Sequence, residues 1–119
     1  MATQPPPPPI LSLIRWPDVS SIDRTELLDA AVVDGRLAEE RGLAGWQRDG
    51  DRLHRSFRFA DFVEAFGFMT RVALIAEPLF HHPEWSNVYD RVDIFVTTHD
   101  AGGLTELDLE FARRVSAAA

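Results

Sequence analysis

The strongest periodic pattern in this chain is an apolar stripe between positions 61 and 77. Asp61 followed three residues later by Glu64 resembles a capping box, and Pro78 ends or kinks a regular helix, so the two signals bracket the stripe. The spacing predicts one face of an α-helix that begins after Asp61. The stripe consists of Phe62, Ala65, Phe66, Met69, Val72, Ala73 and Ala76.

Three apolar residues, Phe68, Leu74 and Ile75, lie off this stripe. A helix that is apolar on more than one face usually packs on something besides its own sheet. We therefore expect a homo-oligomer, either a homodimer or a homotetramer.

A β-hairpin is predicted before this helix. Asp49-Gly50 separates two strand-like runs, 46–48 and 52–59, and Asp-Gly in this setting is a strong hairpin signal. In the second strand Arg55 interrupts a face that is otherwise apolar, which predicts that the strand end near the turn is exposed.

A second pair of strands is predicted within 87–98, with a turn at Asp90-Arg91. After that turn Val92, Ile94 and Val96 alternate with more polar residues, as expected for a strand with one buried face.

Two further helices complete the pattern. The first is predicted to begin near Ser20 or Ser21 and to continue to about Arg41, with an interruption at Asp34-Gly35. The last should begin at Thr105, which is a good N-cap with Asp108 at the third helical position. The order α-β-β-α-β-β-α predicts the α+β class: a two-layer α/β sandwich with a four-stranded antiparallel sheet and the helices on one face.

The N-terminal region differs in character from the rest. Pro5 to Pro9 is a run of five prolines, which favours an extended polyproline II helix. Such a run can be a ligand for an aromatic groove, but a tail or spacer is the favoured interpretation. We expect residues 1–19 to be a disordered tail and residues 20–119 to form one domain.

Composition excludes several classes of function. The net charge of −7 argues against binding to nucleic acid or to an anionic membrane. The chain contains no cysteine, no apolar run long enough for a membrane span and no signal peptide pattern. A cytoplasmic protein is expected.

Three of the four histidines, His81, His82 and His99, fall within one stretch. Because Pro83 favours an extended conformation at the preceding residue, His81 and His82 should point to opposite sides and should not bind one metal together. The three histidines with Glu77 could still form a zinc site. Proton transfer suits three histidines better, since each can gain or lose a proton near neutral pH. Surface histidines beside a proline turn are the alternative on spacing alone.

The spacing of these residues resembles the signature of the pterin-4a-carbinolamine dehydratase family. Glu77 is followed after three residues by His81-His82-Pro83, after five more by Tyr89, after nine by His99 and after eight by Asp108. The runs 65–77 and 81–92 are also similar to this family, and the resemblance covers roughly residues 21–115. Pro78 and Phe80 depart from it, since the family more often has polar residues there.

The resemblance implies loss of water from a 4a-hydroxytetrahydropterin, in the recycling of the cofactor that aromatic amino acid hydroxylases use. It implies a pterin substrate, a functional link to such a hydroxylase, and neither a metal nor an organic cofactor. Some animal members also act as dimerisation cofactors of a homeodomain transcription factor, so a non-enzymatic binding module is one alternative. A catalytically quiet relative that binds another metabolite is a second.

The resemblance also implies roles for individual residues. His81, His82 and His99 would be catalytic, with His82 and His99 as the acid/base groups and His81 binding and polarising the pterin. Glu77 and Asp108 would orient histidines. Asp108 could instead be a charge at the third position of a helix, or have both roles. Trp46 resembles a site-lining tryptophan of the family, with core packing as its alternative. The implied substrate-binding residues are Trp46, Pro83, Thr97 and Thr98.

Overall fold

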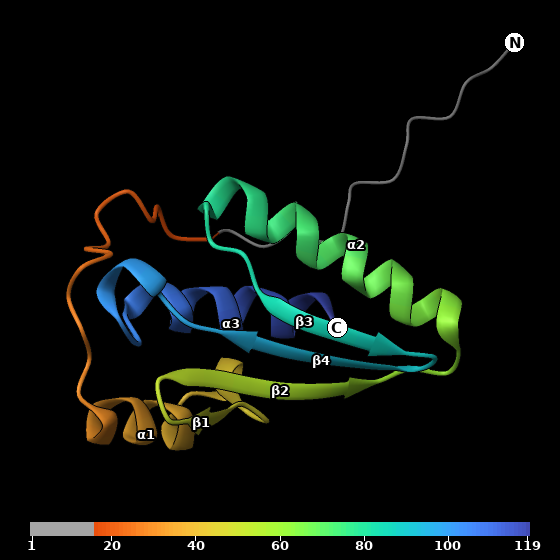
Figure 1. Cartoon of the computed structure of the whole chain (residues 1–119), viewed down its shortest axis with the longest axis horizontal. Coiled ribbons are helices and arrows are strands. Elements are labelled where there is room, and N and C mark those ends of the chain that lie inside the picture. The colour runs from red at the N-terminus through yellow and green to blue at the C-terminus, as the bar shows by residue number, and fades with distance from the viewer. Residues whose placement is uncertain (1–15) are drawn as a thin grey trace, which may run out of the picture.

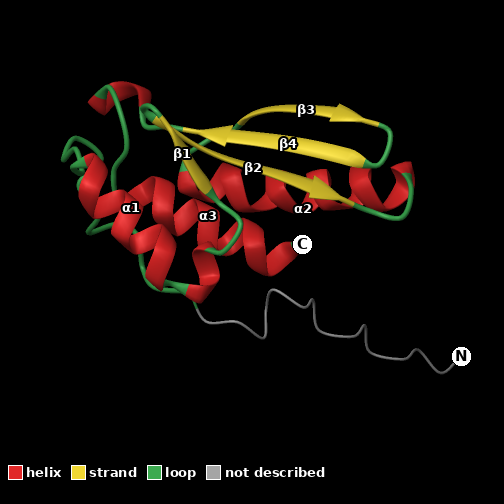
Figure 2. Cartoon of the chain, turned by 90° about the horizontal axis from the view of Figure 1, so that it is seen from below, coloured by secondary structure: helices red, strands yellow, loops and turns green. Residues whose placement is uncertain are grey.

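The computed structural model describes residues 16–119, so the proline run and the apolar segment 10–14 lie outside the described residues. One layer is a four-stranded antiparallel sheet and the other consists of helices that all lie on one side of it (Figures 1 and 2). The predicted fold class is therefore confirmed. Within the described part, none of the helices combines the length and apolar character that crossing a membrane requires. The elements are α1 (Ala30–Glu39), η2 (Arg41–Leu43), β1 (Gln47–Asp49), β2 (Arg52–Arg58), α2 (Phe62–Leu79), β3 (Glu84–Val88), β4 (Arg91–Val96), η3 (His99–Ala101) and α3 (Glu106–Ala118).

The sheet has the strand order β1-β2-β4-β3. The predicted hairpin is present, since Asp49 pairs with Arg52 across the turn, and Gly50 has a φ of 59°, which glycine adopts without strain. The second hairpin turns at Tyr89-Asp90, one residue before the predicted position. The predicted alternation in β4 is confirmed: its inward residues Val92, Ile94 and Val96 are buried against the helices.

Helix α2 begins where predicted but continues through Pro78 to Leu79, and its buried face differs from the predicted stripe. Phe62, Phe66 and Ala73, which were placed on the inward stripe, are exposed. Phe68, which was placed off it, is fully buried, with its ring centroid 4.7 Å from that of Phe57. Because both faces of this helix are apolar, periodicity alone could not tell which one faces the sheet. The buried face consists of Ala65, Phe68, Val72, Ile75, Ala76 and Leu79.

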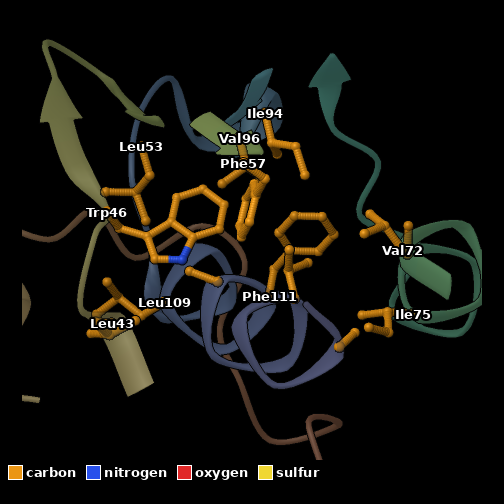
Figure 3. Close-up of a cluster of buried hydrophobic side chains, with 14 of the residues drawn as sticks. Leu43, Trp46, Leu53, Phe57, Val72, Ile75, Ile94, Val96, Leu109 and Phe111 are labelled. Atoms are coloured by element: carbon orange, nitrogen blue, oxygen red, sulfur yellow. The ribbon is translucent and has the colours of Figure 1, made fainter. Parts of the chain in front are cut away.

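The core lies between the sheet and helices α2 and α3. Figure 3 shows Val72 and Ile75 of α2 on one side of Phe111, with Trp46 and Phe57 on the other. All five side chains are less than 10% exposed. This packing fixes α2 and α3 side by side, and both helices contribute to the site described below.

Strand β2 also departs from the prediction. Leu53, at the strand end near the turn, is fully buried, so this end is not exposed as expected. The guanidinium of Arg55 lies 4.4 Å from the ring centroid of Phe57 and donates a hydrogen bond to Ser116 Oγ over 3.0 Å. Burial lowers the pKa of Arg55. A long arginine can thus share an inward face when its head group finds an aromatic ring and an acceptor.

The first helix begins later than predicted. The segment 20–29 forms turns, and Asp23 Oδ1 accepts hydrogen bonds from both the backbone N–H and the hydroxyl of Thr25. Such a local side-chain bond competes with helix formation, which explains the later start at Ala30. The predicted interruption at Asp34-Gly35 is wrong, since both residues lie inside α1.

Residues 16 and 17, which fall in the range 1–19 expected to be a tail, contact helix α3. The guanidinium of Arg114 in α3 donates to the carbonyl oxygen of Pro17 over 2.9 Å and lies 5.4 Å from the ring centroid of Trp16.

Candidate active site

One hollow of about 220 Å³ brings the three histidines of the motif together. Its lining residues follow α2 and β4 or precede α1. Figure 1 shows these three segments near one another at one end of the molecule. Its walls come from parts of the chain that are far apart in sequence. The lining residues are Arg24, Phe80, His81, His82, Thr97, Thr98, His99 and Asp100.

His81 is held by a buried carboxylate. Its Nε2 lies 2.6 Å from Asp108 Oδ1, and the two side chains are 7% and 0% exposed. The other carboxylate oxygen, Oδ2, accepts hydrogen bonds from Thr98 Oγ1 at 2.7 Å and from the backbone N–H of Thr105 at 2.8 Å. Since a carboxylate bonded in this way can only accept, neutral His81 carries its proton on Nε2 and leaves Nδ1 as an acceptor.

Asp108 therefore makes two kinds of contact at once. It completes the capping box of α3, in which the Thr105 side chain also accepts from a helix N–H, and it bonds to His81. The predicted cap at Thr105 is confirmed. Because Thr98 gives its single hydroxyl proton to Asp108, the 2.9 Å contact between the two threonine hydroxyls requires Thr105 to donate to Thr98. The start of α3 is thus hydrogen-bonded to the end of β4.

His82 points to a different environment from His81, as the extended geometry before Pro83 predicts. Its side chain is 61% exposed, and its Nε2 lies 3.2 Å from Oε1 of Glu77 in the last turn of α2. Both partners are open to water, so this pair can exchange protons with solvent. Pro83 itself does not line the hollow.

His99 also pairs with a carboxylate, one that the sequence did not suggest. Its Nε2 lies 3.1 Å from Oε1 of Glu84, and both side chains are more than half exposed. Glu84 begins β3 and pairs with Phe95 of β4, so the order of the strands brings it beside the residues that follow β4. Arg24, Asp100 and Glu84 are the site residues that sequence reasoning missed.

The threonines after β4 occupy different positions. Thr98 belongs to the buried hydrogen-bond network described above, and Thr97 Oγ1 donates to the carbonyl oxygen of Asp51 over 2.6 Å. Both line the hollow, although neither shows a free hydroxyl proton for a ligand in this arrangement.

Trp46 does not lie at this site. It is 4% exposed, its ring meets that of Phe57 edge-on at 6.0 Å, and its Nε1 donates to Ser116 Oγ over 2.9 Å (Figure 3). The indole finds both apolar contacts and a hydrogen-bond acceptor in the core, which is the usual arrangement for a buried tryptophan. The expectation that Trp46 covers a ligand is therefore replaced by its alternative, core packing.

The zinc site weighed for Glu77 and the three histidines is not assembled. Within residues 16–119 no three side chains of the histidine, aspartate or glutamate type come close enough together to hold a metal ion. The fourth histidine, His54, lies away from the hollow, stacked on Phe95 at 4.2 Å and 3.2 Å from Asp93 Oδ1.

This arrangement suits proton transfer on a small molecule. Two exposed histidines, each beside a carboxylate, and one buried histidine of fixed orientation converge on a hollow smaller than the roughly 300–1,000 Å³ typical of drug-sized ligands. Histidines can give and accept protons near neutral pH, so such a site can protonate one atom of a ligand while it deprotonates another.

Comparisons with known proteins point to one family. A family model described as pterin 4 alpha carbinolamine dehydratase matches residues 26–118. A protein of Rhizobium johnstonii named "Putative pterin-4-alpha-carbinolamine dehydratase" is 52% identical over 98 residues, which cover 81% of this chain and 94% of that protein. A protein of the same name from Synechococcus is 59% identical over 75 residues, 63% of this chain and 81% of that one.

Two solved structures of proteins described as pterin dehydratases or as similar to them have a fold like that of this chain. The crystal structure of a transcriptional coactivator/pterin dehydratase from Brucella melitensis superposes with a TM-score of 0.73 at 46% identity, covering 79% of this chain and 99% of that one. A pterin dehydratase-like protein described as a RuBisCO assembly factor of the alpha-carboxysome superposes with a TM-score of 0.56 at 24% identity, covering 66% and 94%. The latter likeness concerns the fold alone.

Proposed function

Because the chain belongs to the pterin-4a-carbinolamine dehydratase family, we propose that it removes water from a 4a-hydroxytetrahydropterin to give the quinonoid dihydropterin. The observation that carries this proposal is the meeting of His81, His82 and His99 around one hollow. A scaffold that only binds a partner has no need for three histidines in such a place.

The reaction needs two proton transfers. The bond between carbon 4a and its hydroxyl oxygen breaks, the oxygen gains a proton and leaves as water, and the proton on N5 is removed as the double bond between C4a and N5 forms. We assign these transfers to His82 and His99, because both rings are exposed at the hollow and each lies beside a carboxylate. Glu77 and Glu84 would orient these rings.

His81 is assigned a binding role. Its Nε2 is directed to Asp108, so its Nδ1 is the atom left for the pterin or for a bound water. A buried ring that is hydrogen-bonded to a fixed carboxylate has little freedom to reorient during a proton transfer. It can still hold and polarise a ligand. Thr97 and Thr98 would provide nearby surface within the hollow, and Pro83 would keep the chain extended beside it.

The proposal predicts dehydratase activity without added metal. Purified protein would be mixed with freshly formed 4a-hydroxytetrahydropterin, and the appearance of quinonoid dihydropterin would be followed by absorbance before and after exhaustive chelation. We expect a rate above the spontaneous one and no loss on chelation. A loss that zinc restores would refute the acid/base assignment. No acceleration by a folded sample would instead favour the non-enzymatic binding module.

We also propose that the chain forms a dimer or tetramer through α2. Phe62, Val63, Phe66 and Leu74 of this helix are 48–78% exposed, which is unusual for so many large apolar side chains on one element. Light scattering at micromolar concentration should give a multiple of 13.4 kDa. The variant Phe66→Glu should lower that mass, because it places a charge in the buried interface. A monomeric mass for the unmodified chain would contradict the proposal.

A further inference from the structure

The turn that leads from α2 into the two adjacent histidines has an unusual residue at its centre. Phe80 has φ 50° and ψ 41°, a left-handed conformation that glycine normally provides at the end of a helix. The backbone N–H of Phe80 donates to the Glu77 carbonyl and that of His81 donates to the Ala76 carbonyl, the bond pair of a Schellman motif. A bulky residue in this conformation is strained, so neighbouring contacts must hold it.

Arg24 provides such contacts from outside the helix. Its Nη1 donates to the Phe80 carbonyl oxygen over 3.0 Å, and its Nη2 donates to the Leu79 carbonyl oxygen. These carbonyls are among those that a helix end leaves without partners, and the end also carries partial negative charge. The last turn of α2 contains no basic residue of its own. Arg24 therefore supplies both the donors and the positive charge that this helix end lacks.

Hydrogen bonds hold the segment that carries Arg24 both before and after this residue. Pro17 accepts a hydrogen bond from Arg114 of α3, and the backbone N–H of Leu28 donates to the carbonyl oxygen of Leu104 over 2.8 Å. Figure 1 shows this segment, drawn from red to orange, passing beside the C-terminal end of α2 before it reaches α1. Arg24 lies before residue 26, where the match to the family model begins.

We propose that Arg24 is a positioning residue for the site. By holding the carbonyls of Leu79 and Phe80, it fixes the left-handed turn from which His81 and His82 project in different directions. Loss of the guanidinium lets this turn relax toward conformations that a phenylalanine prefers, and both rings shift with it. The effect on turnover rests on the proposed dehydratase activity, whereas the effect on the histidine rings does not.

The first test is therefore independent of activity. Long-range nitrogen–proton NMR spectra of the full chain report the tautomer and surroundings of each histidine ring. Arg24→Ala should change the ring signals of His81 and His82. Arg48→Ala is the matched control, since Arg48 also donates to a backbone carbonyl, that of Gly50, but lies outside the hollow and outside this segment, so both rings should stay as they are. Unchanged ring signals in Arg24→Ala would overturn the proposal.

A second substitution tests the cause. Glycine adopts a left-handed conformation without strain, and the Phe80 side chain is 76% exposed, so Phe80→Gly removes the strain with little loss of packing. When added to Arg24→Ala, it should restore the ring signals of the unmodified protein. Failure to restore them would show that the turn is not what Arg24 controls.

Kinetics separate positioning from substrate contact. Misplaced acid/base groups slow the chemical step, so Arg24→Ala should lower kcat by about 10–100-fold and change KM much less. Arg24→Lys, which keeps a cation and a donor, should recover part of that loss. A rise in KM alone, with kcat and the histidine rings unchanged, would mean that Arg24 contacts the substrate and would overturn the positioning role.

Discussion

Replacing His82 or His99 with alanine is expected to lower kcat by about 10²–10⁴-fold while affinity for the pterin changes less. Both rings are exposed at the hollow and each is paired with a carboxylate, so each can take up or release a proton between turnovers. Binding should depend mainly on the walls of the hollow, which neither substitution removes.

The comparison that makes this prediction informative is His81→Ala. His81 is buried and bonded to Asp108, so we expect its loss to weaken affinity more than it slows turnover. His54→Ala is the control, because His54 lies outside the hollow and should leave both constants unchanged. A kcat equal to that of the unmodified protein in His82→Ala or in His99→Ala would remove that residue from the mechanism. If all three site variants lost only affinity, water or Glu77 would have to carry the protons.

Asp108→Ala is expected to impair both folding and catalysis. The substitution leaves three buried donors without their acceptor: His81 Nε2, the Thr98 hydroxyl and the Thr105 N–H. We expect the free energy of unfolding to fall by roughly 3–5 kcal/mol. For a domain of this size the Tm should fall by more than about 10 °C. Activity measured well below that temperature should fall as well, because His81 loses its fixed orientation.

Glu106→Ala is the matched control for this prediction. Glu106 is also an acidic residue in the first turn of α3, but its side chain is 44% exposed and pairs with Arg36 at the surface. Its removal should cost about 1 kcal/mol or less. Equal stability of the two variants in thermal unfolding would show that the buried carboxylate does not hold the start of α3 to the end of β4.

The sequence correctly predicted the elements that depend only on residues close to one another in the chain. The Asp49-Gly50 hairpin, the alternation Val92, Ile94 and Val96, and the Thr105 cap are all present. The phase of α2 could not be predicted, since the choice between its two apolar faces depends on which rings it meets across the interface. The late start of α1 depends on a single side-chain turn at Asp23, which competes with helix formation.

The site shows the same division. Spacing and family resemblance pointed to the three histidines and to Asp108. In the fold, His81 and Asp108 lie within hydrogen-bond distance of each other. Glu84 could not be identified from spacing, because its contact with His99 depends on β3 lying beside β4. Arg24 could not be identified either, since its contact depends on the path of an irregular segment past a helix end 55 residues away.

If the histidines around this hollow carry the dehydration of the pterin, removing both exposed rings should abolish it. The most direct measurement is the dehydration rate of 4a-hydroxytetrahydropterin with the unmodified chain and with the double variant His82→Ala/His99→Ala, both shown to be folded. We expect a rate well above the spontaneous one for the unmodified chain and close to the spontaneous one for the double variant. Equal acceleration by both proteins, or none by the unmodified chain, would contradict it.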